Sequence, residues 1–183
     1  MSFARIVSLG CHDLRTPLAA VSGFAKTLER VGELDERNAH FVSLIDGAAD
    51  ELTELIDQLG VLARIEAGSY APVLESADTL ALASSTDERV LVTGGGEAID
   101  TAVPDLSRSL EALAIAAVRH GELDQVTWTV RGRELELAPV TAAAGPIVTG
   151  ADLRDFGAAI AGRVIEALGG SLSLEGETLL VKL

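Results

Sequence analysis

Two apolar repeats open the chain and constrain its fold more than any other feature. The first repeat consists of Val7, Cys11, Leu14, Leu18, Val21, Ala25 and Leu28. The second repeat consists of Phe41, Ile45, Ala48, Leu52, Leu55, Leu59 and Leu62. Spacings that alternate between four and three residues are typical of helices that pack along a coiled-coil-like seam. Between the repeats, Gly32 predicts a turn and Asp35 predicts the N-cap of a second helix. We therefore expect an antiparallel helical hairpin over residues 1–68.

A hairpin of two helices cannot bury both seams completely. A four-helix bundle made by two copies of the chain would bury them, so the repeats favour a homodimer. The alternative is an intramolecular hairpin that packs on the rest of the chain.

The charge and cysteine content exclude several classes of partner. The formal net charge of -14 argues against nucleic acid and against an anionic membrane surface, since both need clustered Lys and Arg. One cysteine excludes an internal disulfide and provides no metal cluster. No apolar run approaches the roughly 20 residues needed to span a bilayer, and the first residues do not resemble a signal peptide. We expect a cytoplasmic protein without a bound metal.

The remainder of the chain predicts a small α+β domain. We expect a connector at residues 69–80 and a domain at residues 81–183. The expected strands are 88–93, 125–131, 134–137, 171–174 and 178–183, and the expected helices are 106–120 and 152–168. Gly94–Gly96 are expected to end the first strand in a turn, since they lack the Lys-Ser/Thr ending of a P-loop. Helices interleaved with mostly antiparallel strands indicate an α/β sandwich.

The run from His12 to Leu18, His-Asp-Leu-Arg-Thr-Pro-Leu, carries the most specific chemistry. It resembles the phosphoacceptor box of bacterial sensor histidine kinases, S-H-[ED]-L-R-T-P-L, with Cys11 at the serine position. The Arg-Ile-Glu-Ala-Gly string at 64–68 resembles the end of the second helix in the same family. We expect Cys11 to be a small seam residue, which places His12 beside the seam and within reach of solvent.

The resemblance assigns roles to four residues. An imidazole is neutral near pH 7 and can accept a phosphoryl group and release it, so His12 is the expected phosphoacceptor. Asp13 can accept a hydrogen bond from one ring nitrogen and fix the tautomer. Thr16, one turn from His12, occupies the position that orients a hydrolytic water in this family. Arg15 either meets charge on a receiver domain or is a solvated surface arginine.

Residues 81–183 resemble the ATP-binding domain of the same kinases, through 117–121 and 163–172, but the residues that handle nucleotide are missing. The two asparagine positions of the N box fall on Ala112 and Ala116, and alanine offers Mg²⁺ no oxygen ligand. The stretch 138–147 contains no aspartate to bind adenine, and the phosphate-binding glycine box falls on Asp155–Ala158. We therefore expect no bound nucleotide or other cofactor.

Two basic residues in this region have two interpretations. Arg119 and His120 either meet a phosphate or are helix C-terminal cations favoured by the helix dipole.

Three functions remain open. The first is a dimeric histidine phosphotransferase, in which His12 exchanges a phosphoryl group with response-regulator receiver domains that supply the Mg²⁺. The second is an ATP-dependent sensor histidine kinase with divergent nucleotide boxes. The third is a non-enzymatic adaptor that binds a receiver.

Overall fold

The computed structural model describes residues 3–32 and 34–183, which form two compact units, Met1–Ser69 and Tyr70–Leu183. The helices are α1 (Phe3–Val31), α2 (Glu36–Glu66), α3 (Thr79–Leu82), α4 (Val103–Gly121), α5 (Gly145–Val148) and α6 (Phe156–Ala167). The strands are β1 (Glu75–Asp78), β2 (Val90–Gly96), β3 (Ala98–Thr101), β4 (Val126–Gly132), β5 (Glu134–Ala138), β6 (Ser171–Glu175) and β7 (Thr178–Lys182). None of the helices within the described ranges combines the length and apolar character that crossing a membrane requires.

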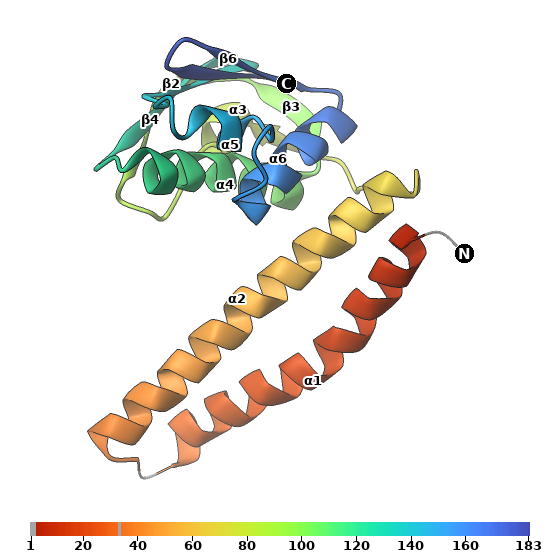
Figure 1. Cartoon of the computed structure of the whole chain (residues 1–183), viewed down its shortest axis with the longest axis vertical. Coiled ribbons are helices and arrows are strands. Elements are labelled where there is room, and N and C mark those ends of the chain that lie inside the picture. Colours follow the sequence, from red (N-terminus) through yellow and green to blue (C-terminus); the bar gives the residue numbers. More distant parts are fainter. Residues whose placement is uncertain (1–2, 33) are drawn as a thin grey trace. The chain divides into compact units, whose positions relative to one another are not determined.

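The first unit is the expected helical hairpin of α1 and α2 (Figure 1). The Asp35 side chain accepts a hydrogen bond from the Asn38 backbone N–H at 2.8 Å, which confirms it as the N-cap of α2. Gly68 follows the helix with φ +64°, and its N–H donates to the Ile65 carbonyl, as a helix-ending glycine does. The predicted hairpin and its end signals are therefore confirmed.

The seam inside this hairpin is formed mostly by small residues. Cys11, Ala25, Val42 and Ala49 are each at most 8% exposed, so these residues are buried within the hairpin. Many of the larger residues of the expected seams stay outside this contact. Those that remain exposed are Leu14, Val21, Leu28, Phe41, Ile45, Leu52 and Leu55. Cys11 and Ala25 belong to the expected α1 repeat, whereas Val42 and Ala49 each lie one residue after a member of the expected α2 repeat. The heptad pattern therefore did not identify the α2 residues that face α1.

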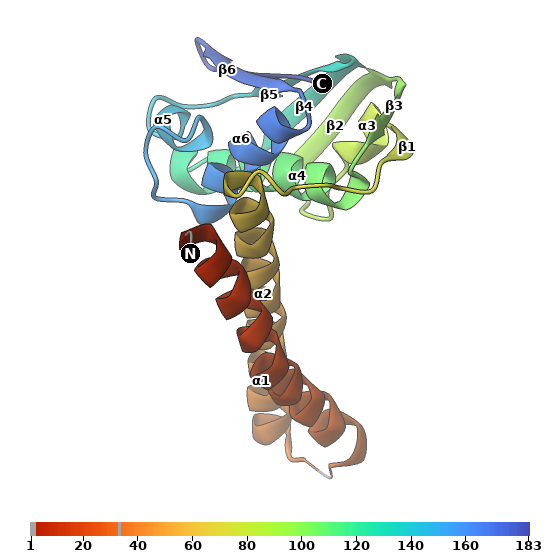
Figure 2. The same cartoon turned by 90° about the vertical axis from the view of Figure 1, so that its right-hand side faces the viewer.

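The second unit is the expected α/β sandwich. Its five-stranded sheet has the order β2-β4-β5-β7-β6, in which β2 and β4 are parallel and every other neighbouring pair is antiparallel. Helices α4 and α6 pack against each other on one side of this sheet (Figures 1 and 2). The largest fully buried side chains between the layers include Trp128, Leu106, Leu110, Leu113, Leu135, Leu137, Ile165 and Leu179. A mainly aliphatic core with one buried tryptophan thus supports the sandwich.

Gly94–Gly96 belong to β2, so the expectation of a turn at these glycines is wrong. They pair in parallel with Val130–Gly132 of β4. Gly94 has φ +103°, and a Cβ there would lie 2.1 Å from the Val130 carbonyl oxygen. Glycine is therefore needed inside the strand because the neighbouring backbone leaves no room for a side chain.

The connector and the start of α6 also differ from what the sequence predicts. Residues 75–78, within the expected connector at 69–80, form β1, which pairs antiparallel with β3 in a separate two-stranded sheet. Helix α6 begins at Phe156 rather than at residue 152, because the Asp155 side chain caps it by accepting the Ala158 N–H at 3.0 Å.

Candidate functional site

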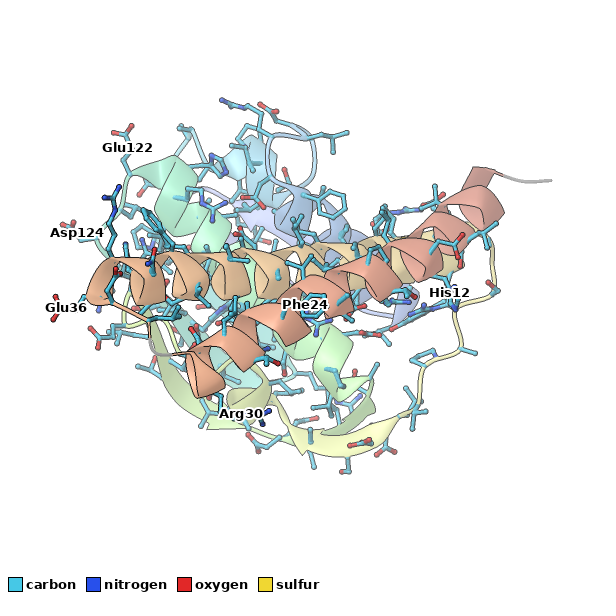
Figure 3. The ribbon with its side chains drawn as sticks, turned by 90° about the horizontal axis from the view of Figure 1, so that it is seen from below. His12, Phe24, Arg30, Glu36, Glu122 and Asp124 are labelled. Atoms are coloured by element: carbon cyan, nitrogen blue, oxygen red, sulfur yellow. The ribbon has the colours of Figure 1, made fainter. Side chains whose placement is uncertain are left out.

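His12 lies on the solvent-exposed flank of α1, where Figure 3 labels it. Its side chain is 77% exposed, and its Nδ1 lies 3.1 Å from Oδ1 of Asp13. An ionised carboxylate can only accept a hydrogen bond, so this contact favours the tautomer that carries its proton on Nδ1. The lone pair of Nε2 then remains available in the plane of an accessible ring. The arrangement suits a nucleophilic histidine.

Cys11, the residue before His12, is 2% exposed and has a free thiol. The expectation of a small seam residue at this position is confirmed. Because Cys11 anchors this turn of α1 against α2, the next residue is directed to the flank of the hairpin.

Arg15 forms an ion pair across the hairpin rather than standing alone on the surface. Its Nε and Nη2 both donate to Oδ1 of Asp57, at 2.9 and 2.7 Å. Both side chains are about two-fifths exposed, at 43% and 39%. Arg15 and Asp57 are 42 positions apart, and sequence reasoning did not single out Asp57. Only the register between α1 and α2 brings these residues together.

Thr16 lies on the exposed surface of α1, one helical turn from His12. Helix α1 continues through Pro17, which lies inside it. The structure therefore gathers His12, Asp13, Arg15 and Thr16 on two successive turns of one helix. These are the four residues expected from the sequence.

The second unit places a buried carboxylate where the glycine box was expected. Asp155 is 9% exposed, and its Oδ1 caps α6. Its Oδ2 lies 3.1 Å from Nε2 of His120 and 3.4 Å from Nη1 of Arg119. Both basic residues are in the last turn of α4, as the helix C-terminal interpretation required. Both side chains are directed at the buried carboxylate of Asp155.

Several of the other nucleotide-box positions lie in the apolar core. Ala116 is fully buried on α4, among the residues that pack beneath the sheet. In the stretch 138–147, Val140, Ala144 and Ile147 are at most 1% exposed, and the last of them belongs to α5, which packs on α4 and α6. No group of three or more potential metal ligands occurs in the part of the chain that the structure describes.

Comparison with known proteins identifies the first unit most clearly. The sequence model of the family described as His Kinase A (phospho-acceptor) domain matches residues 6–68. The probable sensor histidine kinase TcrY of Mycobacterium tuberculosis is 36% identical over 64 residues, which cover 35% of this chain and 14% of TcrY. The sensor protein DivL of Caulobacter vibrioides is 34% identical over 80 residues, which cover 44% of this chain and 10% of DivL. The chain thus spans a small part of the length of these relatives.

A solved structure resembles nearly the whole chain. Full-length ShkA in complex with AMPPNP matches with a TM-score of 0.68 and 22% sequence identity, over 98% of this chain and 45% of that chain. This likeness extends the shared fold from the hairpin into the second unit.

Proposed function

Because the chain carries a HisKA phosphoacceptor domain and belongs to the histidine kinase family, we propose that it is a histidine phosphotransferase. His12 accepts a phosphoryl group from the aspartate of one receiver domain and passes it to another. The observation that carries this proposal is the 77% exposed His12 ring, whose Nδ1 lies 3.1 Å from Asp13. HisKA domains, as a family, dimerise and interact with response regulators.

The transfer step follows from this geometry. Nε2 of His12 attacks the phosphorus of an aspartyl phosphate, the P–N bond forms, and the P–O bond to the receiver breaks. The receiver aspartate leaves as a carboxylate with the bonding electrons. Since Nδ1 keeps its proton, the phosphorylated ring carries a positive charge, which the Asp13 carboxylate stabilises. The same steps in reverse deliver the group to a second receiver.

Thr16 gives the same surface a hydrolytic role in this proposal. Its hydroxyl is exposed one turn from His12, in the position expected to orient a water toward a bound receiver. Mg²⁺ in this proposal is held by the receiver and supplies charge stabilisation to the phosphoryl oxygens. The chain itself contributes the nucleophile, its orienting carboxylate and the docking face.

The residues of the second unit do not fit a nucleotide with its Mg²⁺. Ala116 offers a methyl group buried in the core where an oxygen ligand is required. Asp155 presents a carboxylate at the N-terminus of α6, where a phosphate would need free N–H groups. We therefore propose that His12 receives its phosphoryl group from a receiver domain and not from ATP.

The exposed apolar stripe of the hairpin supports a homodimer. Leu14 and Val21 on α1, and Ile45 and Leu52 on α2, are 46–54% exposed. Phe24 projects from the exposed side of α1 and is 72% exposed (Figure 3). A second copy of the hairpin would cover such stripes in a four-helix bundle. Light scattering at micromolar concentration tests this, and a monomer near 19 kDa would contradict it.

Two parallel incubations test the phosphotransferase. One sample receives γ-labelled Mg²⁺-ATP, and the other receives a panel of receiver domains that carry labelled aspartyl phosphate. We expect label on His12 only from a receiver, and no label on a folded His12→Ala variant. Asp13→Asn should slow the transfer about 10-fold, which corresponds to one charge-assisted hydrogen bond.

Each alternative has its own outcome. Label on His12 from ATP would refute the proposal and identify an autokinase. Receivers that bind without any transfer would indicate an adaptor. Phosphate relay by a folded His12→Ala protein would show that another residue carries the group.

A further inference from the structure

Two guanidinium groups converge over one glycine of α2. A Cβ at Gly60 would lie 3.5 Å from Nη2 of Arg15 and 3.7 Å from Nη1 of Arg64. The two groups are therefore separated by no more than the sum of these distances. Arg64 makes no ion pair or side-chain hydrogen bond with any residue in the described ranges, while Arg15 has Asp57 as its partner. Of these two neighbouring guanidinium groups, only Arg15 therefore has a carboxylate partner among the described residues.

The guanidinium pair is level with His12 along the hairpin. Arg15 of α1 contacts Asp57 of α2, and the two helices run in opposite directions. Gly60 is three residues after Asp57, and His12 is three residues before Arg15. Both steps move about 4.5 Å in the same direction along the hairpin, since a helix rises about 1.5 Å per residue. His12 and Arg15 are also neighbours at positions i and i+3 of the same helix.

We propose that Arg15 and Arg64 form a binding site for the phosphoryl group on His12. While no phosphoryl group is present, the Arg15 guanidinium binds the Asp57 carboxylate instead. This inference rests on the proposed phosphotransferase function. A guanidinium group binds phosphoryl oxygens with two parallel donors, and two such groups match the dianion on Nε2. Asp57 is a positioning residue: it holds Arg15 against α2, and it releases Arg15 when the stronger anion arrives.

The exposure of the ion pair sets the size of the effect. A carboxylate and a guanidinium that are each about two-fifths exposed attract each other only weakly, because water and salt screen them. The exchange of Asp57 for a phosphoryl group therefore slows the reaction modestly. Removal of the Asp57 charge should accelerate phosphorylation of His12 by about fivefold at most.

The test uses phosphoramidate, a small donor that requires neither a receiver nor ATP. In this reaction the P–N bond of the donor breaks, the bond from phosphorus to Nε2 forms, and ammonia leaves. The first-order rate of His12 phosphorylation is measured in the full chain. We expect Asp57→Asn to raise this rate about two- to fivefold. The matched control is Asp50→Asn, which removes another α2 carboxylate that pairs with Lys26 instead, and it should leave the rate within about 1.5-fold of the wild type.

A second substitution shows whether the gain acts through the guanidinium. In the double variant Arg15→Gln with Asp57→Asn, the rate should equal that of Arg15→Gln alone. A gain that persists without Arg15 would overturn the proposal, because Asp57 would then act only by repelling the anionic donor. Equal rates for Asp57→Asn and Asp50→Asn would overturn it as well.

Arg64 has a separate prediction. Arg64→Gln should slow phosphorylation about two- to fivefold, whereas Arg37→Gln, at the other end of α2, should not. Equal rates for these two variants would remove Arg64 from the site. Circular dichroism verifies that each variant is folded. If phosphoramidate labels wild-type His12 and the Asp57 variants behave as the control, only this inference fails; if no donor labels His12, the proposed function itself fails.

Discussion

Replacement of Asp155 by alanine should destabilise the second unit by about 2 kcal/mol. The Oδ1 cap on the Ala158 N–H contributes about 1 kcal/mol, the typical value for a carboxylate N-cap. The Oδ2 contacts add about 1 kcal/mol more, mostly from His120, which is 22% exposed. The Arg119 guanidinium is 66% exposed, so its contribution is small. A unit of this size loses about 4 °C in Tm per kcal/mol, so the expected shift is about 8 °C.

Trp128 provides an assay that reports on the second unit alone. It is the single tryptophan of the chain, and it is fully buried beneath α4 and α6. Urea titrations followed by tryptophan fluorescence therefore measure the unfolding of this unit, whatever the hairpin does. Asp155→Asn keeps a capping oxygen and loses the charge, so it should cost about half as much as Asp155→Ala.

A nearby aspartate serves as the control. Asp152 pairs with Arg154 on the exposed loop before α6, and Asp152→Ala should cost less than about 0.5 kcal/mol. If Asp155→Ala and Asp152→Ala are equally mild, the carboxylate does not hold the start of α6, and the argument from burial is refuted.

Three further predictions concern local geometry and charge. Gly162→Ala should stabilise the second unit by about 0.5–1 kcal/mol in the same urea assay, because a Cβ there meets no atom within 4 Å and alanine favours the helix. Gly94→Ala should destabilise it by more than 2 kcal/mol, roughly the scale of a buried steric conflict, since its Cβ would collide with the Val130 carbonyl; wild-type stability would contradict the strand geometry. The hydrogen bonds from Arg89 lower the pKa of Asp87 from 3.8 to about 2, so this carboxylate stabilises the fold above pH 3.8 and the contribution is lost as the pH falls toward 2. In the Arg89→Gln variant, the pKa of Asp87 measured by NMR titration should return toward 3.8. An unchanged pKa would refute the hydrogen bonds from Arg89 as the cause.

The hairpin could be predicted because its signals are local. Gly32 and Asp35 mark the turn within four residues of each other, and both heptad repeats are continuous. The contact face could not be predicted, because a heptad repeat defines an apolar stripe without saying which chain covers it. Ala25 and Ala49 fill the seam of the single hairpin, while larger residues of the stripe remain exposed. Small residues carry little weight in an apolar pattern, although they permit the closest helix approach.

The site was predictable to the same extent. His12 and Asp13 are adjacent, so their hydrogen bond follows from the motif itself. The partner of Arg15 is 42 residues away and is specified only by the register of α2. The predicted turn at Gly94 is wrong for a related reason. A glycine run predicts a turn unless the neighbouring strand is known. Here the Val130 backbone of that strand requires glycine at position 94, because it leaves no room for a Cβ.

Two aspartates of this chain face basic side chains, and burial separates their roles. Asp155 is 9% exposed and also caps α6, so an external anion could displace it only by breaking the start of a helix. Asp57 is 39% exposed and holds Arg15 through a single oxygen, so an incoming phosphoryl dianion meets little resistance. The contacts of Asp155 with Arg119 and His120 are therefore structural, whereas the contact of Asp57 with Arg15 can be exchanged for another anion. This difference favours anion exchange at the hairpin, which carries the nucleophile His12. It disfavours anion exchange at Asp155, where the phosphate-binding glycine box was expected.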